Sequence, residues 1–358
     1  MDAGDEPLFS GGGLLARGLL DLTDDPAALD SSGFWAVLAT FEGALTCARF
    51  ADVRPGAPEP APWVGPRRED WTSSLERARY VGAVEAIRSR IAAGEVYQAN
   101  LCRILSAPLP DPDRANMAGL AALLAAGNPA PYAAVLRLPD ARVSVAGASP
   151  ELFLRRSGRV VESGPIKGTA REIRDLQDKD RAENVMIVDL VRNDLGRVCA
   201  TGSVTVPSLC AVEAHPGLVH LVSTVRGELR PDAGWADLLA ATFPPGSVTG
   251  APKLAALGVI ADYEPAARGP YCGALGWVDA EAGTGCLAVS IRTFWREDDV
   301  LRFGTGAGIT WASDPAAEWA ETELKAERLV ALASTPPTSA SALAPVLADA
   351  SVGVGDPV

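Results

Sequence analysis

The chain has 358 residues, of which 48% are hydrophobic and 22% charged, a composition typical of globular proteins with one large domain or two smaller ones. Its formal net charge is −13 and no basic run stands out, so neither nucleic acid nor an anionic membrane is an expected partner. An anionic substrate would therefore need a locally positive site or a recruited metal ion.

Cysteine use and the distribution of apolar residues bear on the cellular compartment. No run of about 18 apolar residues is present, so no segment is predicted to span a membrane. The first residues, Met1 to Glu6, are acidic and lack the apolar core of a signal peptide. The six cysteines form no Cys-x-x-Cys pair and fit reduced thiols better than disulfides, so we expect a cytoplasmic protein.

The N-terminal part is predicted to consist of strands. Short apolar runs broken by Gly and Asp, such as Phe34–Leu38, indicate strands in residues 1 to about 50. Residues 52–70 are rich in Pro and Arg and predict a surface loop. We expect residues 1–74 to form a short strand-rich segment that packs on the main fold.

A helix is predicted over residues 75–93. Ser73 or Ser74 could cap its start, and Gly94 is placed to end it. The apolar residues that recur at helical spacing are Tyr80, Val81, Val84, Ile87 and Ile91.

Strands and a short helix are predicted next. Val96–Leu105 is expected to be a strand, and Leu120–Ala126 a helix that ends before Pro129. Residues 131–138 and 142–147 alternate between apolar and polar side chains and predict a pair of strands.

The stretch Glu162–Thr169, with the sequence Glu-Ser-Gly-Pro-Ile-Lys-Gly-Thr, follows a predicted hairpin that turns at Gly158. Pro165 fixes one backbone angle, and the two glycines let another group come close. Lys167 lies between them. It is either a solvated loop lysine or a lysine that points into a pocket as nucleophile or anion ligand.

The remaining chain continues the mixed pattern, so the predicted fold class is α+β with large, mostly antiparallel sheets. Residues 75–332 are expected to form the catalytic domain, and the tail 333–358, rich in Ala, Pro, Ser and Thr, is predicted to be disordered. The predicted helices cover 175–191, 235–241, 254–262 and 314–332, and the predicted strands cover 203–206, 217–228, 271–278, 285–294 and 300–310.

Two predicted helices each carry a pair of acids three residues apart. Asp180 and Glu183 share one helix face, and Glu318 and Glu321 share another. Four carboxylates on two faces could bind a hard cation such as Mg²⁺, or they could be two solvated surfaces.

Other polar groups also have two interpretations. Gly304–Gly308 could offer backbone N–H groups to an anion, or it could be a tight bend between a strand and a helix. Arg292 could pair with a carboxylate or be a surface charge. His220 lies in an apolar strand, where a histidine is more often a core residue than a catalyst. No nucleophile elbow, phosphate-binding loop or zinc spacing is present.

Taken together, the motifs resemble the chorismate-utilising enzyme family over residues 75 to about 330. The strings that carry the resemblance are Gly94–Leu101, Ala148–Glu151, Pro165–Thr169, Lys179–Asn184, Asp189–Arg197, His220–Ser223, Gly246–Lys253, Tyr271–Gly273, Ile291–Thr293, Gly306–Ile309 and Glu318–Thr322.

The resemblance implies a fold in which two sheets pack around a central cleft, with chorismate as the substrate. It implies that Mg²⁺ bridges the ring carboxylate of chorismate to Glu183 and Glu321, with Asp180 and Glu318 in support. It also implies that Glu151 is the general acid that protonates the departing C4 hydroxyl.

The resemblance further implies a set of substrate contacts. Tyr271 and Arg292 match ligands of the pyruvyl carboxylate, and His220 matches a polar group beside the ring. The contacts implied around the ring carboxylate are Gly306, Gly308, Thr169 and Lys325.

Two positions differ between the branches of this family. Isochorismate and salicylate synthases carry a water-activating lysine where this chain has Gln98, and anthranilate synthases carry an alanine where it has Lys167. The combination of Gln98 with Lys167 is similar to aminodeoxychorismate synthase component I. The Leu-Leu-Glu-Ser string associated with tryptophan binding is not found.

The expected activity is therefore Mg²⁺-dependent replacement of the C4 hydroxyl of chorismate by an amino group, in the biosynthesis of 4-aminobenzoate. Ammonia is expected from a separate glutaminase subunit, because no cysteine lies in a Gly-x-Cys-x-Gly elbow. One alternative is C2 amination, as in anthranilate or 2-amino-2-deoxyisochorismate synthases. A more distant alternative is a non-catalytic chorismate-binding subunit.

Overall fold

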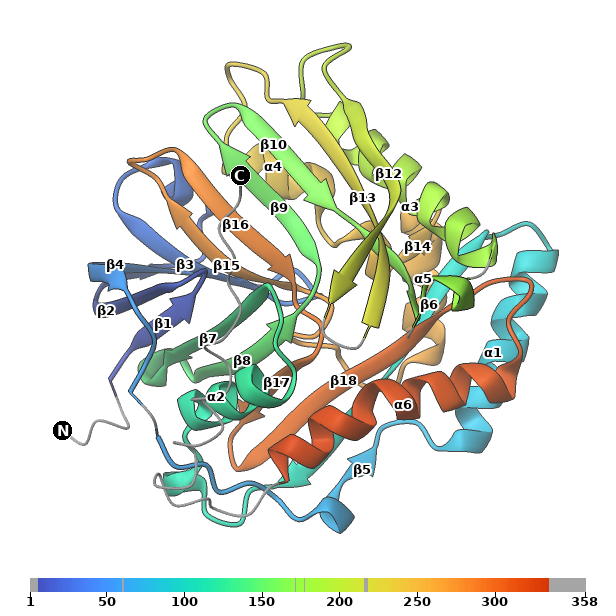
Figure 1. Ribbon diagram of the computed structural model, residues 1–358, viewed down its shortest axis with the longest axis horizontal. Helices are drawn as coiled ribbons and strands as arrows, with labels where there is room; N and C mark the ends of the chain where they lie inside the picture. Colours follow the sequence, from blue (N-terminus) through green and yellow to red (C-terminus); the bar gives the residue numbers. More distant parts are fainter. Residues whose placement is uncertain (1–5, 60, 171, 177, 216–217, 335–358) are drawn as a thin grey trace.

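The computed structural model describes residues 6–59, 61–170, 172–176, 178–215 and 218–334 (Figure 1). The six helices of this part are α1 (Arg77–Ala92), α2 (Met117–Gly127), α3 (Asp178–Gly196), α4 (Trp235–Thr242), α5 (Lys253–Tyr263) and α6 (Pro315–Ala333). Its strands are β1 (Leu8–Gly11), β2 (Leu14–Thr23), β3 (Phe34–Ala39), β4 (Leu45–Pro55), β5 (Thr72–Ser73), β6 (Gln98–Pro108), β7 (Tyr132–Leu138), β8 (Val143–Ser149), β9 (Leu152–Ser157), β10 (Val160–Gly164), β11 (Ile166–Ala170), β12 (Thr205–His215), β13 (Leu218–Glu228), β14 (Gly250–Ala251), β15 (Ala274–Asp279), β16 (Thr284–Val289), β17 (Thr293–Glu297) and β18 (Val300–Ile309).

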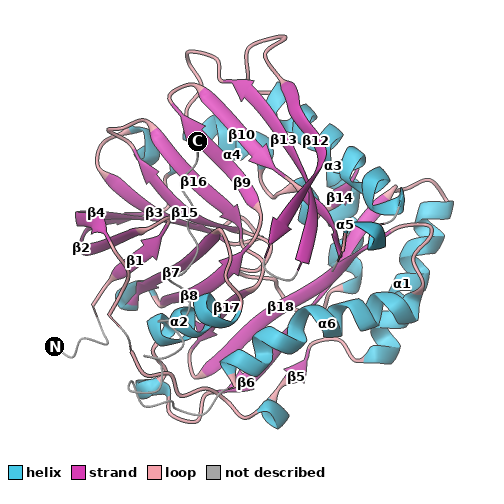
Figure 2. Cartoon of the chain, viewed as in Figure 1, coloured by secondary structure: helices cyan, strands magenta, loops and turns pink. Residues whose placement is uncertain are grey.

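The strands form one continuous antiparallel ladder. It runs from β12 through β13, β10, β9, β16, β15, β3, β4, β2, β1, β7, β8, β17 and β18 to β6. β11 adds to β13, while β5 and β14 add to β6. The ladder is strongly bent and forms two arms, with most helices on the outside (Figure 2). This arrangement confirms the predicted α+β class with mostly antiparallel sheets.

The main apolar core joins strands from distant parts of the ladder with α3 and α4. Trp35 on β3, Phe153 on β9, Leu136 on β7 and Val145 on β8 are all buried in this one cluster. Burial of such large apolar side chains is the main favourable contribution to folding. A second cluster joins α1 and α5 to β6 and β18, with Tyr80 at its centre.

The N-terminal strands are built into the ladder. β1 pairs with β7, and β3 pairs with β15. The loop between β4 and β5 includes Trp63, whose Nε1 donates a hydrogen bond to the Ala333 carbonyl at 2.7 Å. Contacts between distant parts of the chain therefore hold the N-terminal strands in the ladder.

The start of α1 differs from the prediction. The helix begins at Arg77, and its N-cap residue Glu76 makes no side-chain capping bond. Ser74 Oγ instead accepts a hydrogen bond from the Ile104 N–H at 2.9 Å, and Ser73 Oγ donates to the Leu75 carbonyl. Neither serine caps the helix, because both hydroxyls hold the preceding segment.

The C-terminal strands also differ in one respect. The single strand predicted over 285–294 is broken into β16 and β17 by a turn in which Arg292 has a φ of +53°. In addition, Gly304–Gly308 forms neither a bend nor a loop. It belongs to β18 and pairs residue by residue with β6.

Two further predictions concern the ends and the environment of the chain. Within the described residues, no helix is long and apolar enough to cross a membrane. Of the predicted disordered tail, residues 335–358 lie outside the described residues.

Candidate active site

Lys167 lies on β11, where a bulge changes the direction of the backbone. The pairing of β11 with β13 shifts register between Ile166 and Thr169, and Gly168 has a φ of +81°. A Cβ atom at Gly168 would lie 2.8 Å from the Cβ of Asp180 on α3. Only glycine combines this backbone conformation with such close packing, so the sequence Lys-Gly fixes the bulge that orients the lysine.

The two ends of the ladder meet at Lys167. Gly308 on β18 is paired with Asn100 on β6. A Cβ atom at Gly308 would lie 2.9 Å from Asn100 Oδ1 and 3.4 Å from Lys167 Nζ, and it would clash with Gln98 Nε2. An amine and two amides therefore surround one point above a glycine that leaves the space open.

These two amides have unsatisfied polar atoms. Gln98 is 1% exposed and Asn100 is 7% exposed. Both polar atoms of the Gln98 amide, and Oδ1 of Asn100, have no hydrogen-bond partner. Buried polar groups without partners are rare because they cost free energy, so this cluster indicates a binding site for a polar ligand.

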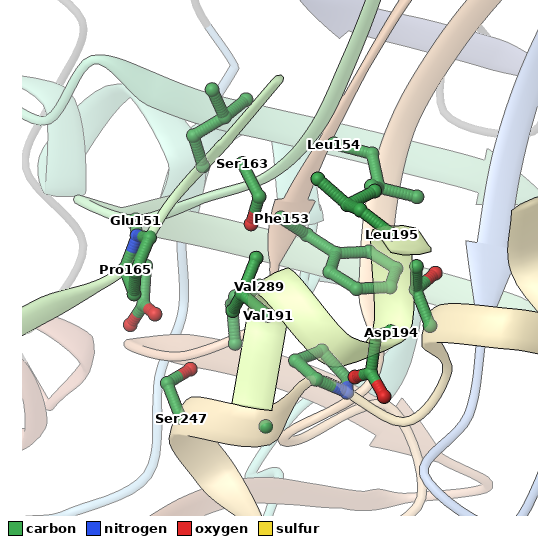
Figure 3. A pocket seen from close by; sticks show the side chains of 14 residues that line it. Glu151, Phe153, Leu154, Ser163, Pro165, Val191, Asp194, Leu195, Ser247 and Val289 are labelled. Carbon is green, nitrogen blue, oxygen red and sulfur yellow. The ribbon is translucent and has the colours of Figure 1, made fainter. Parts of the chain in front are cut away.

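Glu151 lies between β8 and β9 and is 4% exposed. Burial raises the pKa of its carboxyl group to about 7, although the Ser247 hydroxyl, the Lys167 ammonium and the Ile166 backbone act in the opposite direction. A carboxyl group with this pKa is protonated in part at neutral pH and can serve as a general acid. Figure 3 shows Glu151 next to Pro165, with Ser247 nearby.

A small cavity lies behind Glu151 (Figure 3). Its volume is about 20 Å³, which is enough for one water molecule. Glu151, Ser163, Ser247 and Asp194 provide polar groups to its wall, and apolar side chains line the rest. The cavity is too small for an organic substrate.

Two carboxylates from different helices lie near Lys167. Burial raises the pKa of Glu183 on α3, the Lys167 charge lowers it, and the Asp180 and Glu321 charges raise it further. Glu321 on α6 accepts a hydrogen bond from Lys325 Nζ at 2.6 Å. Burial acts to raise the pKa of Glu321, but Lys325 and Lys167 together hold it below its ordinary value.

The other two predicted acids have different surroundings. Asp180 packs through its Cβ under Gly168. Glu318 is buried, which raises the pKa of its carboxyl group, and the Ser313 hydroxyl acts in the opposite direction. Among the described residues, no three acidic, histidine or cysteine side chains are grouped closely enough to form a metal site without a further ligand.

The remaining predicted residues include two cations and an aromatic ring. Lys325 Nζ donates to the Gly306 carbonyl at 3.0 Å in addition to its bond with Glu321. The Tyr271 ring is buried where a side chain at Gly304 would clash with it. Burial lowers the pKa of Arg292, and this guanidinium has no carboxylate partner among the residues that the structure describes.

Two predicted residues lie beside this centre on paired strands. His220 on β13 is 2% exposed and is in register with Thr169 on β11. The side chain of Thr169 lies outside the described part of the chain. Asn100 was not predicted, although it stands two residues after Gln98 on the same strand, a spacing that places two side chains on one face.

Comparison with known proteins gives a family for this arrangement. Residues 42–331 match a family model described as "chorismate binding enzyme". The chain is 42% identical over 275 residues to anthranilate synthase component 1 of Streptomyces coelicolor, covering 73% of this chain and 52% of the relative. It is 36% identical over 273 residues to aminodeoxychorismate synthase component 1 of Escherichia coli, covering 73% and 59%.

A further curated relative and a solved structure are also similar to this chain. An aminodeoxychorismate synthase of Streptomyces pristinaespiralis is 43% identical over 267 residues, which are 71% of this chain and 36% of the relative. The match thus spans between 36% and 59% of the length of these curated relatives. Among solved structures, a putative 2,3-dihydroxybenzoate-specific isochorismate synthase from Bacillus anthracis superposes with a TM-score of 0.77 at 24% identity, covering 93% of this chain and 96% of that one.

Proposed function

Because the chain belongs to the chorismate-binding enzyme family, we propose that it replaces the C4 hydroxyl of chorismate with an amino group and forms 4-amino-4-deoxychorismate, in the biosynthesis of 4-aminobenzoate. Relatives named aminodeoxychorismate synthase, 36% to 43% identical, support this proposal. The observation that carries it is the position of Lys167, whose amine lies over Gly308 near the buried acid Glu151.

The chemistry uses Lys167 as a transient nucleophile. The neutral amine forms a bond to C2 of the ring, the two ring double bonds shift, and the C4–O bond breaks. The C4 hydroxyl leaves as water with a proton from Glu151, which becomes a carboxylate. Ammonia then bonds to C4, the double bonds shift back, and the Lys167 nitrogen leaves C2, so the pyruvyl ether at C3 is retained. Direct attack by ammonia at C4 would give the lysine no role.

Mg²⁺ is the proposed cofactor. Mg²⁺ needs only one or two protein carboxylates when a substrate oxygen and water complete its shell, and Glu183 and Glu321 provide that number from facing helices. The raised pKa of Glu183 fits this role, because a cation would stabilise the charge that burial disfavours. When bound, the cation would neutralise the ring carboxylate. Asp180 and Glu318 would support these two ligands.

The remaining groups would anchor the two carboxylates of chorismate. Lys325, with the open backbone of Gly306 and Gly308 and with Thr169, would hold the ring carboxylate. Arg292, which is half-buried without a carboxylate partner, and Tyr271 would hold the pyruvyl carboxylate. Gln98 and His220 would contact the ring side of the substrate.

The product decides between this function and its main alternative. C2 amination is favoured by the 42% identity to a relative named anthranilate synthase component 1. The purified chain is incubated with chorismate, Mg²⁺ and ammonium, and the products are identified by mass spectrometry and fluorescence. We expect 4-amino-4-deoxychorismate, with its pyruvyl group retained. Anthranilate or 2-amino-2-deoxyisochorismate would overturn the proposal in favour of C2 amination, and no turnover would favour a binding subunit.

A separate glutaminase subunit is the proposed source of ammonia. The relatives are named component 1, and the chain has no Gly-x-Cys-x-Gly elbow. The purified chain should therefore use ammonium salts but not glutamine, until a glutaminase component is added. Glutamine-dependent turnover by the chain alone would contradict this expectation.

A further inference from the structure

The amide of Asn100 has a fixed direction. Its Nδ2 donates to the Ser247 carbonyl at 2.9 Å, and its backbone N–H donates to the Thr249 carbonyl at 2.8 Å. Its own backbone carbonyl accepts from Arg268 Nη2 at 3.2 Å. If the amide oxygen and nitrogen of Asn100 were exchanged, the amide oxygen would lie against the Ser247 carbonyl oxygen, and the two acceptors would repel each other. Oδ1 is therefore the atom that faces the site.

This oxygen has no partner, although it is buried. Asn100 is 7% exposed, and Oδ1 forms no hydrogen bond. Every other polar atom of the residue is satisfied by the protein. An acceptor that stays unsatisfied in an otherwise complete set costs free energy, which indicates that its partner arrives when the site is in use.

Two donors lie near this oxygen. Asn100 Oδ1 and Lys167 Nζ lie 2.9 Å and 3.4 Å from the same point over Gly308, and the unsatisfied Gln98 Nε2 lies at this point as well. The lysine has the longer and more flexible side chain, and its rotation can carry the amine toward the oxygen. The amide oxygen is neutral, so it can orient an amine without the strong preference for the charged form that a carboxylate would add.

We propose that Asn100 is a positioning residue for Lys167: its Oδ1 accepts a hydrogen bond from the amine and directs the nitrogen lone pair toward C2 of the bound ring. This inference rests on the proposed function, in which Lys167 is the nucleophile. The step itself is the one given above, with the bond to C2 formed, the C4–O bond broken and the proton supplied by Glu151.

One turn connects the nucleophile with the acid. The Ser247 carbonyl accepts a hydrogen bond from Asn100 Nδ2, and the Ser247 hydroxyl acts to lower the pKa of the Glu151 carboxyl group. The turn from Gly246 to Thr249 therefore sets the direction of the Asn100 amide and also places a hydroxyl near the acid. Both groups act on one substrate, at C2 and at C4, so a shared support keeps their separation constant.

The test compares three variants with the wild-type chain. Asn100→Leu removes the acceptor and the donor at similar volume. Asn100→Asp keeps an acceptor oxygen, loses the donor to Ser247 and adds a negative charge. Asn116→Leu is the matched control, because Asn116 Oδ1 caps α2 by accepting from the Ala118 N–H at 2.9 Å and takes no part in the site.

Three quantities are measured for each chain: kcat with ammonium, the Kd of chorismate with Mg²⁺, and the fraction of Lys167 adduct trapped by acid quench without ammonia and detected by mass spectrometry. For Asn100→Leu we expect kcat and adduct to fall about 10- to 100-fold, with Kd changed less than about 2-fold, because misplacing a nucleophile by about 1 Å has that effect. Asn100→Asp should retain at least about 10-fold more adduct than Asn100→Leu when each is measured at its optimal pH, because the added carboxylate favours the charged amine and shifts adduct formation to higher pH. The control should match the wild type in all three quantities.

The outcomes separate this inference from the function on which it rests. If the wild type forms the adduct and Asn100→Leu forms the same amount, the positioning role of Asn100 is overturned, whereas the nucleophile role of Lys167 stands. Equal losses in Asn100→Leu and Asn100→Asp also overturn it, because the bond to Ser247 would then carry the effect. Absence of adduct in the wild type overturns both the nucleophile role of Lys167 and its positioning by Asn100. Should Asn100→Leu not fold, the ratio of adduct in Asn100→Asp to that in Asn100→Ala decides in its place.

Discussion

Two buried polar regions contact β6 and differ in how completely their hydrogen bonds are satisfied. In the first, the Arg268 guanidinium donates to both oxygens of Glu264 and to the carbonyls of Val248 and Asn100. In the second, the side-chain amides of Gln98 and Asn100 on β6 lie near Lys167 and have polar atoms without hydrogen-bond partners among the described residues. The first region stabilises the fold, and the second is the candidate binding site.

The comparison shows that burial alone does not distinguish a structural polar cluster from a candidate binding site. Arg268 is as deeply buried as Gln98 and the Glu264 side chain is 5% exposed, yet both charges have partners within the protein. Completeness of hydrogen bonding, rather than burial or charge, distinguishes the structural cluster from the candidate site. Variants in the two regions should therefore affect different measurements.

The largest expected effect is on activity. Glu321→Gln removes a proposed ligand charge and should lower kcat about 1,000-fold, because a bound cation supplies several kcal/mol of charge stabilisation. The fold should be retained, because Glu321 is half-exposed and interacts mainly with Lys325. Thermal unfolding and turnover are measured in parallel. Full activity in this variant, or in wild type with EDTA, would remove the metal assignment.

The next effect is on stability. Arg268→Met leaves the buried Glu264 carboxylate with a single partner, the Cys102 N–H at 2.8 Å. Removing one partner of a buried ion pair typically costs about 3–5 kcal/mol, which denaturant unfolding can measure. The double variant Arg268→Met, Glu264→Leu should lose less than the sum of its parts. A loss below about 1 kcal/mol in the single variant would show that this region is not the structural support inferred here.

The sequence predicted which segments are helices and strands better than it predicted where these segments begin and end. Regular periodicity identified α1 and the strand pair β7–β8, because local side-chain spacing follows which face is buried. The break at Arg292 was missed, because a positive φ in a residue other than glycine has no composition signal. The predicted caps at Ser73 and Ser74 were wrong, because tertiary partners on β6 and in the preceding segment bind these hydroxyls.

The candidate site was predictable in its parts and not in its assembly. The motifs around Lys167 and Glu151 carried the family resemblance, and the comparisons with known proteins confirm the family. The unsatisfied oxygen of Asn100 could not be read from the sequence, because a missing partner is a property of the folded arrangement of β6, β11 and β18. The same holds for Arg268 and Glu264, which appear in the sequence as ordinary charges.

A smaller effect concerns the pH dependence of stability. The Glu151 carboxyl has its pKa raised by burial to about 7 in the fold, against 4.5 for an ordinary glutamic acid. The folded state thus binds more protons than the unfolded state between these values, and the stability contribution falls as pH rises through this window. Glu151→Gln should therefore be more stable than the wild type at pH 8, by up to roughly 3 kcal/mol. This difference in the free energy of unfolding should shrink toward pH 4. A gain in stability that does not depend on pH would contradict the raised pKa of Glu151.

The smallest effect is expected for an acid on the same helix as Glu183 but away from the site. Asp189 on α3 forms an i,i+3 ion pair with Arg192 at 2.8 Å, and both side chains are more than half exposed. Water and salt screen such a pair, so Asp189→Asn should change the free energy of unfolding by less than about 0.5 kcal/mol. It should leave kcat unchanged, whereas Glu183→Gln should reduce kcat as strongly as Glu321→Gln. If the two variants of α3 had equal effects on turnover, Glu183 would be one more solvated acid of the helix surface, and the assignment of Mg²⁺ to the face of α3 that carries Glu183 would lose its basis.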